Sequence, residues 1–144
     1  MSNAEVTVLP DDADLEPAFD VRLDVFVDEQ GVDEAIEIDG KDPDATHVLA
    51  RIDDEAVGTA RLREIGDRTG KVERVAVREA HRDTGLGRAL VERVETLARE
   101  RDLQRLELHS QTRVEEFYES LGYETTSDVF DEAGIPHVEM EKEL

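Results

Sequence analysis

RDTGLGRA, at residues 82–89, is the stretch that decides the fold of this chain. It follows an alternating apolar segment at 71–77 and opens an amphipathic segment that continues to about Arg101. Its two glycines let the backbone approach a ligand closely. The N–H groups in the first turn of a helix have no partner within the helix and carry the positive end of its dipole, so they attract anions. This order of strand, glycine loop and helix start predicts a cradle for a phosphate-bearing ligand.

The segments around this loop show alternating strand and helix patterns. We expect strands at 5–9, 46–52, 56–65, 71–77, 103–109, 123–130 and 137–140, and helices at 14–30, 86–101 and 113–121. For the acidic segment 33–45 we expect a loop or a short helical piece. The order predicts an α/β fold, with a mixed, mostly antiparallel sheet of about seven strands and helices on both faces. No linker or repeat divides the chain, so we expect a single domain at 1–144.

The composition is strongly acidic, with 17 Lys and Arg against 38 Asp and Glu and a formal net charge of −21. A disordered acidic chain is rejected, because helical and strand periodicity persists between the acids. A folded domain in a salt-rich cytoplasm fits better, since molar salt shortens the Debye length to about 3 Å and screens self-repulsion. Such a surface is a poor partner for nucleic acid. The acids reflect the solvent and are no sign of a basic substrate.

Several absences in the sequence narrow the class of protein further. There is no apolar run long enough for a membrane span, no signal-peptide pattern and no cysteine. We therefore expect a cytoplasmic protein without disulfides, thiolate metal sites or a cysteine nucleophile. No two histidines have the helical i, i+4 spacing of a zinc site, and the acids at 39–44 lack the spacing of a calcium loop, so we expect no metal.

The glycine loop differs from two common phosphate-binding patterns. No Gly-Lys-Ser or Gly-Lys-Thr follows it, which excludes a Walker loop. The third glycine of the dinucleotide fingerprint is missing, and no suitable acid ends a following strand. These exclusions leave a different kind of phosphate cradle.

Two motifs together carry a resemblance to a known family. They are Arg82-x-x-Gly85-x-Gly87 after VAV at 75–77, and FYESLGY at 117–123. The first resembles the acetyl-CoA pyrophosphate motif of the GNAT acetyltransferase superfamily, and the second resembles that family's helix with a tyrosine near the thiol. The order of elements over nearly the whole chain also matches. More narrowly, the chain is similar to the ElaA-like branch at FVDEQGV (26–32), LHSQ (108–111) and GIPH (134–137) followed by Met140.

The resemblance implies that acetyl-CoA lies in a V between the strand ending at Val77 and the strand at 103–109. Backbone groups of Val75 and Val77 would hold the pantetheine like an added strand. The Arg82 side chain and loop amides, including that of Ala89, would hold the pyrophosphate. The implied cofactor-binding residues are Val75, Ala76, Val77, Arg82, Asp83, Thr84, Gly85, Leu86, Gly87, Arg88, Ala89 and Gln111.

Three arginines around the loop suggest a local inversion of charge. Arg78, Arg82 and Arg88 would form a basic patch in an otherwise acidic chain, which a highly anionic cofactor requires. In the alternative interpretation they are solvated or paired with Asp83 and Glu79.

Two residues are candidates for the chemistry. The resemblance implies that Tyr118 protonates the departing thiolate, as a phenol with a pKa near ~10 can do; otherwise it is a core aromatic. Glu73 would accept a proton from the acceptor ammonium, directly or through water, if partial burial raised its pKa. Otherwise Glu73 decorates the strand or pairs with Arg74 or Arg61. A backbone N–H near Val75, where the sheet splays, would meet the developing oxyanion.

The acceptor side carries weaker signals. The resemblance implies that early helices cover it, which makes Phe26, Glu29 and Gln30 candidates for substrate contact. His109 is a further candidate, and His137 could also approach the pocket, although a structural role suits both histidines. Tyr123 is expected to be a packing residue.

These observations lead to one expected function and two alternatives. We expect acetyl transfer from acetyl-CoA to a primary amine of an unidentified small molecule or peptide, by direct attack in a ternary complex, because no nucleophile–base pair for an acyl-enzyme is present. The alternatives are a non-catalytic acyl-CoA-binding sensor or partner module, and a transferase for a longer acyl group. We expect no nucleic-acid or membrane partner, and a homodimer stays open.

Overall fold

The computed structural model describes residues 4–144. Its strands are β1 (Glu5–Val8), β2 (Thr46–Ile52), β3 (Glu55–Gly66), β4 (Thr69–Val77), β5 (Arg105–Gln111), β6 (Glu124–Thr125), β7 (Phe130–Glu132) and β8 (Ile135–Glu143). Its α-helices are α1 (Glu16–Arg22), α2 (Glu34–Glu37), α3 (Leu86–Glu100) and α4 (Glu115–Glu119). A π-helix follows α1 at Leu23–Glu29, and short 3-10 helices lie at Asp42–Asp44, Glu79–His81 and Thr112–Val114. None of the helices in this range is long and apolar enough to cross a membrane.

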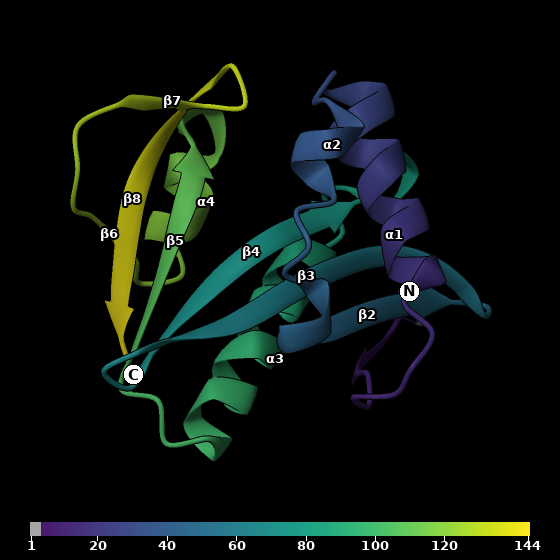
Figure 1. Cartoon of the computed structure of the whole chain (residues 1–144), viewed down its shortest axis with the longest axis horizontal. Coiled ribbons are helices and arrows are strands. Elements are labelled where there is room, and N and C mark those ends of the chain that lie inside the picture. Colours follow the sequence, from purple (N-terminus) through teal and green to yellow (C-terminus); the bar gives the residue numbers. More distant parts are fainter. Residues whose placement is uncertain (1–3) are drawn as a thin grey trace.

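The strands of the described chain form one mixed sheet. Its order is β1-β2-β3-β4-β5-β8-β6, and β7 pairs with β8 (Figure 1). β4 and β5 pair in parallel, and the other pairs are antiparallel. In Figure 1, α1 and α2 lie in front of the sheet and α3 lies behind it. The expected α/β architecture, with helices on both faces of a mostly antiparallel sheet, is confirmed.

One expected strand is wrong in its extent. The segment 123–130 forms only the short β6, and its last residue already belongs to β7, which brings the sheet to eight strands. The side chain of Ser127 explains the break, because its Oγ accepts the N–H of Glu139 at 2.8 Å where a backbone carbonyl would continue the ladder. Ser side chains compete with backbone partners in this way.

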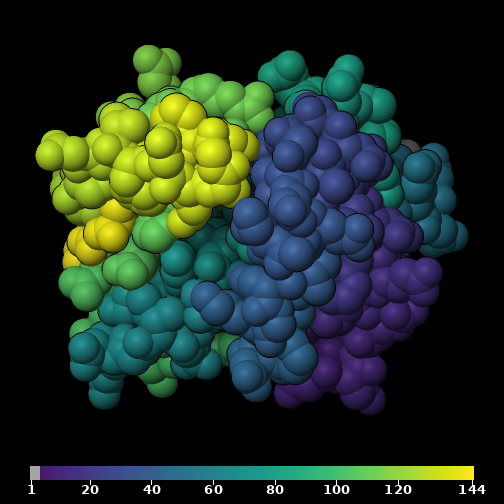
Figure 2. Space-filling view, turned by 45° about the horizontal axis from the view of Figure 1, so that its top comes forward, coloured from purple at the N-terminus to yellow at the C-terminus, as the bar shows by residue number. Residues whose placement is uncertain are grey.

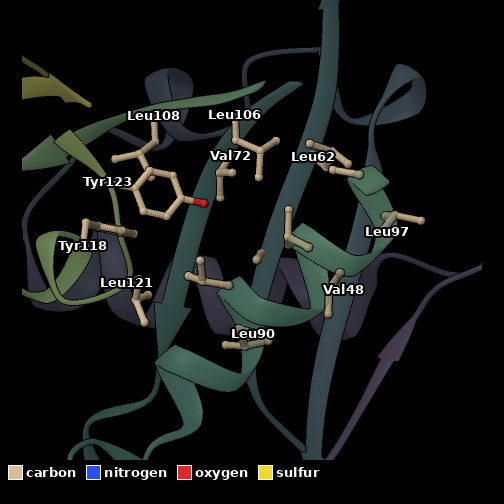
Figure 3. Close-up of a cluster of buried hydrophobic side chains, with 14 of the residues drawn as sticks. Val48, Leu62, Val72, Leu90, Leu97, Leu106, Leu108, Tyr118, Leu121 and Tyr123 are labelled. Carbon is tan, nitrogen blue, oxygen red and sulfur yellow. The ribbon is translucent and has the colours of Figure 1, made fainter. Parts of the chain in front are cut away.

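The apolar face of α3 fixes the glycine loop against the sheet. Leu86, Leu90, Val91, Val94, Leu97 and Ala98 are buried, at the spacing of one helix face. They belong to one core with Val48, Leu62, Val72 and Leu106 of four neighbouring strands (Figure 3). Each such side chain contributes about 1.5–3 kcal/mol when fully buried, so the start of α3 is held firmly at the end of β4.

The opposite face of the sheet holds α1 and the π-helix. Val21, Val25 and Ala76 form a smaller cluster there. The helix expected at 14–30 is present, but its second half has π geometry: the N–H of Gln30 reaches the carbonyl of Val25 at 3.2 Å. Such wider turns are common at functional sites.

The sheet splays at its centre. β4 and β5 pair only from Thr69 to Val72 on β4, after which β4 continues against β3 and β5 against β8. A bulge in β4 lies at this point, because Arg74 and Val75 face the single residue Ala60 of β3. Arg74 has a φ of +56°, a value that few non-glycine residues adopt. Bulges bend a strand and re-aim its groups, so this one opens the V that the sequence predicts.

Candidate active site

A cleft of about 470 Å³ fills the V between β4 and β5. Residues 71–77 of β4 and 108–111 of β5 line it, with the α2 segment (36–41) on one side and the β7–β8 turn (132–137) on the other. Figure 2 shows the yellow end of β7 and β8 facing the blue α2 segment across this hollow, with teal residues between them. The expected residues that line the cleft are Phe26, Gln30, Glu73, Val75, Ala76, Val77, Arg82, His109, Gln111 and Tyr118.

Backbone N–H groups of the glycine loop have no hydrogen-bond partner in the described chain at the start of α3. Gly85 is the N-cap with a φ of +83°, and no side chain of the described residues caps the helix. The first bond within the helix runs from the N–H of Ala89 to the carbonyl of Gly85 at 3.1 Å. The expectation that Ala89 offers a free amide is therefore wrong, and the amides of residues 85–88 are those left over. The Leu86 side chain is buried in the core, so only its backbone can serve a ligand.

The neighbouring Asp83 and Thr84 shape this loop. Asp83 has a φ of +61°, a left-handed conformation that Asp adopts more readily than most residues. The Thr84 hydroxyl donates to the carbonyl of His81 at 2.7 Å. The Thr84 side chain thus serves the turn, and neither residue lines the cleft.

Two of the three arginines of the expected basic patch are bound by acids, and the third, Arg88, stays largely exposed. Arg78 pairs with Asp24 at 2.8 Å, and Arg88 lies 3.6 Å from Glu92. Arg82 donates to both carboxylate oxygens of Glu29, at 2.5 and 2.6 Å. The π-helix supplies two of these acids, which lie more than 50 positions from their partners, and neither Asp83 nor Glu79 takes the expected role.

The Arg82–Glu29 pair also changes the interpretation of Glu29. Its hydrogen bond with Arg82 lowers the pKa of Glu29, and the same bond raises the pKa of Arg82. Glu29 does not line the cleft. It therefore pairs with Arg82 and does not contact the substrate as expected. Arg82 is further held by its Nε, which donates to the carbonyl of Val77 at the end of β4 at 2.9 Å.

The raised pKa expected for Glu73 is wrong. Burial by itself raises the pKa of this carboxyl, but hydrogen bonding to Arg63 and the charges of Arg61, Arg63 and Lys71 outweigh burial and lower the pKa to about 2. Arg61 donates to its Oε1 at 2.9 Å and Arg63 to the same oxygen at 2.5 Å. An ionised carboxylate whose lone pairs are used in this way is a poor proton acceptor for an amine.

Glu73 belongs to an ion-pair network that fixes the α2 segment to the sheet. Arg22 and Arg61 are fully buried. Arg22 bonds Glu37 at 2.6 Å and Asp42 at 2.7 Å, while Arg61 bonds Asp39 at 2.9 Å and Asp42 at 3.0 Å. Buried charges of this kind are tolerated only when they are paired and hydrogen-bonded.

Acid should weaken the folded state through Glu73. Its folded-state pKa of about 2 lies below the ordinary value of 4.5, so its ion pairs contribute stability that is complete above about pH 4.5 and is lost as the pH falls towards 2. The shift corresponds to about 3 kcal/mol. Unfolding free energies measured in molar KCl across this range should fall less steeply for Glu73→Gln than for the unmodified protein. Parallel curves would contradict this network.

Tyr118 and Tyr123 belong to the same core cluster, with ring centroids 5.8 Å apart, and differ in the partners of their hydroxyls. Tyr118 lines the cleft, and no group of residues 4–144 hydrogen-bonds its hydroxyl. Tyr123 belongs to the core and donates to Glu95 at 2.9 Å, which confirms its packing role. Burial raises the pKa of Tyr118 above the ordinary phenol value assumed from the sequence. This phenol therefore stays protonated at neutral pH, with its O–H available to a ligand.

Two histidines meet a glutamate on the acceptor side of the cleft. Both histidines were candidates from the sequence, but the glutamate, Glu132, was missed. His109 Nδ1 lies 2.8 Å from Glu132, and His137 Nε2 lies 3.6 Å from the same carboxylate. Glu132 comes from β7, within the segment expected to be a turn. Its position two residues before Gly134-Ile135-Pro136-His137 was the signal available in the sequence, since the register that pairs β5 with β8 is a long-range property.

Gln30 and Gln111 close the V at its open end. The Gln111 amide donates to the Gln30 side-chain oxygen at 2.8 Å, and Arg113 donates to Gln111 at 2.8 Å. The two glutamines thus bridge the π-helix and β5. Outside the cleft, Glu107, Glu139 and Glu141 lie close enough together to share a cation, but exposed acids often cluster without one.

The splayed sheet and the uncapped start of α3 define an acyl-CoA N-acyltransferase fold. The crystal structure of Escherichia coli ElaA has this fold, with a TM-score of 0.87 and 28% identity over 96% of this chain and 99% of that one. A GNAT acetyltransferase structure from Elizabethkingia anophelis with acetyl-CoA bound also shares it, with a TM-score of 0.77 and 18% identity over the full length of both chains.

The chain belongs to the GNAT acetyltransferase family, whose "Acetyltransferase (GNAT) domain" model matches residues 11–144. An inferred acetyltransferase of Bacillus subtilis (strain 168) is 42% identical over 141 residues, which cover 96% of this chain and 95% of the relative. The ElaA protein of Escherichia coli (strain K12) is 34% identical over 129 residues, covering 86% and 84%. The resemblance to the family and to ElaA is thereby confirmed.

Proposed function

We propose that this chain is an N-acetyltransferase that transfers the acetyl group of acetyl-CoA to a primary amine. One observation carries the proposal: the bulged, splayed β4 ends beside a helix whose first amides have no partner in the described chain. A splayed strand offers backbone groups to an extended ligand arm, and a helix start offers donors to phosphates. Family membership and the acetyl-CoA in the Elizabethkingia anophelis structure support the same cofactor.

The cofactor would be bound by backbone groups and one arginine. Val75 and Val77 would bond the pantetheine arm, and the amides of residues 85–88 would bond the pyrophosphate. Arg82 can join them with its two remaining guanidinium N–H groups, or by exchanging its bonds with Glu29 for bonds to phosphate oxygens. A pyrophosphate offers more charge than one carboxylate and retains bidentate geometry, so the exchange is favourable when the cofactor binds.

The reaction would be a direct attack in a ternary complex. The amine nitrogen forms a bond to the thioester carbonyl carbon, the carbon–sulfur bond breaks, and the sulfur leaves with a proton from Tyr118. An N–H released by the bulge near Val75 would stabilise the oxyanion. Rate would come from positioning and electrostatics, because the described cleft lacks a nucleophile–base pair.

His109 replaces Glu73 as the group that takes the proton from the acceptor nitrogen. It lines the cleft with its side chain 24% exposed, Glu132 lies 2.8 Å from its Nδ1 and Glu139 lies 3.9 Å from its Nε2. With the Nδ1 proton donated to Glu132, Nε2 would be the acceptor. A carboxylate in this position stabilises the imidazolium that forms. Proton exchange with solvent then restores His109 and Tyr118.

Removing the imidazole should slow the reaction. His109→Gln is expected to lower kcat/KM about 100-fold. Glu132→Gln should reduce kcat/KM by a smaller factor, because Glu132 only positions the ring. The rates are measured by thiol release at saturating acetyl-CoA. An unchanged kcat/KM in His109→Gln would assign the base elsewhere.

Thiol release from acetyl-CoA with a broad amine panel tests the proposed function. The assay is run in molar KCl as well as dilute buffer, because the acid excess suits a salt-rich cytoplasm. Turnover with an amine supports the transferase. Tight binding of CoA without turnover on any amine would favour the alternative of a sensor, and turnover only with longer acyl-CoA substrates would favour the other alternative.

A further inference from the structure

The acceptor half of the cleft is formed by residues 36–41, Lys71–Arg74, His109 and the β7–β8 turn. Two of the three lysines of the chain, Lys41 and Lys71, line it. Lys142 lies elsewhere, bonded to Glu95 at 3.1 Å and to the Leu121 carbonyl at 2.7 Å. In a chain with 38 acids and 17 bases, both remaining lysines lie at one hollow, which Glu37, Asp39, Glu73 and Glu132 also line.

The carboxylates beside these lysines are already bound by arginines. Glu37 forms ion pairs with Arg22 at 2.6 Å and with Arg74 at 3.0 Å. Asp39 forms ion pairs with Arg61 at 2.9 Å and with Arg74 at 3.4 Å. Each of these acids therefore has its counter-charge without a lysine, and neither is available to neutralise Lys41 or Lys71.

Lys71 forms an ion pair without a hydrogen bond. Its Nζ lies 3.6 Å from Glu73 Oε2, and the oxygens of Glu73 already accept bonds from Arg61 and Arg63. The Lys71 side chain is 19% exposed, and it donates no hydrogen bond to any group in the described part of the chain. An ammonium has three donors, so the Nζ of Lys71 has donors left for a ligand.

The opposite wall carries the complementary charge. Glu132, held by His109, faces the cleft, and the charge of Lys71 contributes to the lowered pKa of Glu132, after the larger effect of the His109 hydrogen bond. A ligand here meets a carboxylate–imidazole pair on one wall and lysine ammonium groups with unused donors on the other. That arrangement matches a molecule with an amine and an acid.

We propose that the acceptor is a primary amine that also carries an acidic group, a carboxylate or a phosphate, and that Lys71 with Lys41 binds this acidic group. This inference rests on the proposed function and narrows its substrate class. The acid would supply the acceptors that Lys71 lacks, and its binding would place the amine near His109. Both acid types share this chemistry, so the experiment separates them.

Matched pairs of amines test the inference. Glycine is compared with glycinamide, and O-phosphoethanolamine with ethanolamine, by thiol release at saturating acetyl-CoA. We expect kcat/KM to be at least about tenfold higher for the acidic member of one pair or both, as a charge-assisted bond provides. The pair with the larger ratio identifies the acid type. Neutral members that react as well as the acidic members would overturn the inference.

Variants locate the preference. Lys71→Gln should reduce the ratio between acidic and neutral members to near one. Arg68→Asn removes the same charge at an exposed turn outside the cleft, and Asn tolerates the left-handed φ of +53° found there. It should keep the ratio. A preference that survives in Lys71→Gln contradicts the assignment.

Titration calorimetry with N-acetylglycine and N-acetylglycinamide in the presence of CoA gives a readout without turnover. The acid is expected to bind more tightly than the amide, and equal affinities would count against the inference. Failure to bind CoA at all would instead refute the proposed function, so the two failures are distinguishable.

Discussion

Gly87→Leu is expected to lower the affinity for acetyl-CoA at least about 100-fold, or about 2.7 kcal/mol, without unfolding the protein. A Cβ at this position would lie 3.5 Å from Phe117 and 4.0 Å from Val77, which are ordinary contacts. A longer side chain would extend between the end of β4 and α4, across the proposed path of the cofactor. Leucine also favours helix more than glycine does, so the helix itself should not be weakened.

Two comparisons make the Gly87 result specific. Gly87→Ala should bind with a much smaller loss, because its methyl group fits. Thr96→Leu adds a similar side chain at an exposed site of the same helix and should leave affinity unchanged. Calorimetry gives the dissociation constants, and circular dichroism checks the fold. Unaltered affinity in a folded Gly87→Leu variant would remove the cradle from the account.

Tyr118→Phe is expected to lower kcat by about 100-fold or more, while the dissociation constant of acetyl-CoA changes little. The ring keeps its edge contact with Phe117, at 4.9 Å between centroids, so packing survives and only the hydroxyl is lost. Single-turnover kinetics at saturating acetyl-CoA separate this chemical step from binding.

Tyr123→Phe is the matched control for Tyr118→Phe. Its hydroxyl is bonded to Glu95 in the core, and losing a bond to a charged acceptor should cost about 1.5–3 kcal/mol of stability. The folded Tyr123→Phe protein should keep its kcat. If Tyr118→Phe behaved like this control, with lower stability and an unaltered rate, Tyr118 would be a core residue only.

The fold was largely predictable because its main signals are local. Apolar periodicity predicted α3. The strand expected at 46–52 agrees with β2. The loop before α3 was recognisable from its glycines. The break in 123–130 was not, because it depends on Ser127 meeting Glu139 across the sheet. The bulge at Arg74 also depends on pairing with β3, and neighbouring sequence carries no mark of it.

The site was predictable in its backbone and less so in its charges. The V, the uncapped amides and the position of Tyr118 follow from motifs and element order. The partners of Arg82 and Glu73 do not, because Glu29 and Arg63 reach them only through the tertiary fold. A strongly acidic chain offers many counter-charges for each arginine, so sequence alone could not choose among them. The placement of Glu132 and Lys71 beside the cleft was missed for the same reason.

The central claim is that acetyl-CoA binds along β4 and at the start of α3. Amide NMR of isotope-labelled protein, titrated with acetyl-CoA in molar KCl, tests it most directly. The account predicts that the largest shifts occur at Val75 and Val77 and at the amides of residues 85–88, with smaller shifts on β1 and β2. Saturation with acetyl-CoA that leaves these amides unshifted, or that shifts a different surface, would contradict the account.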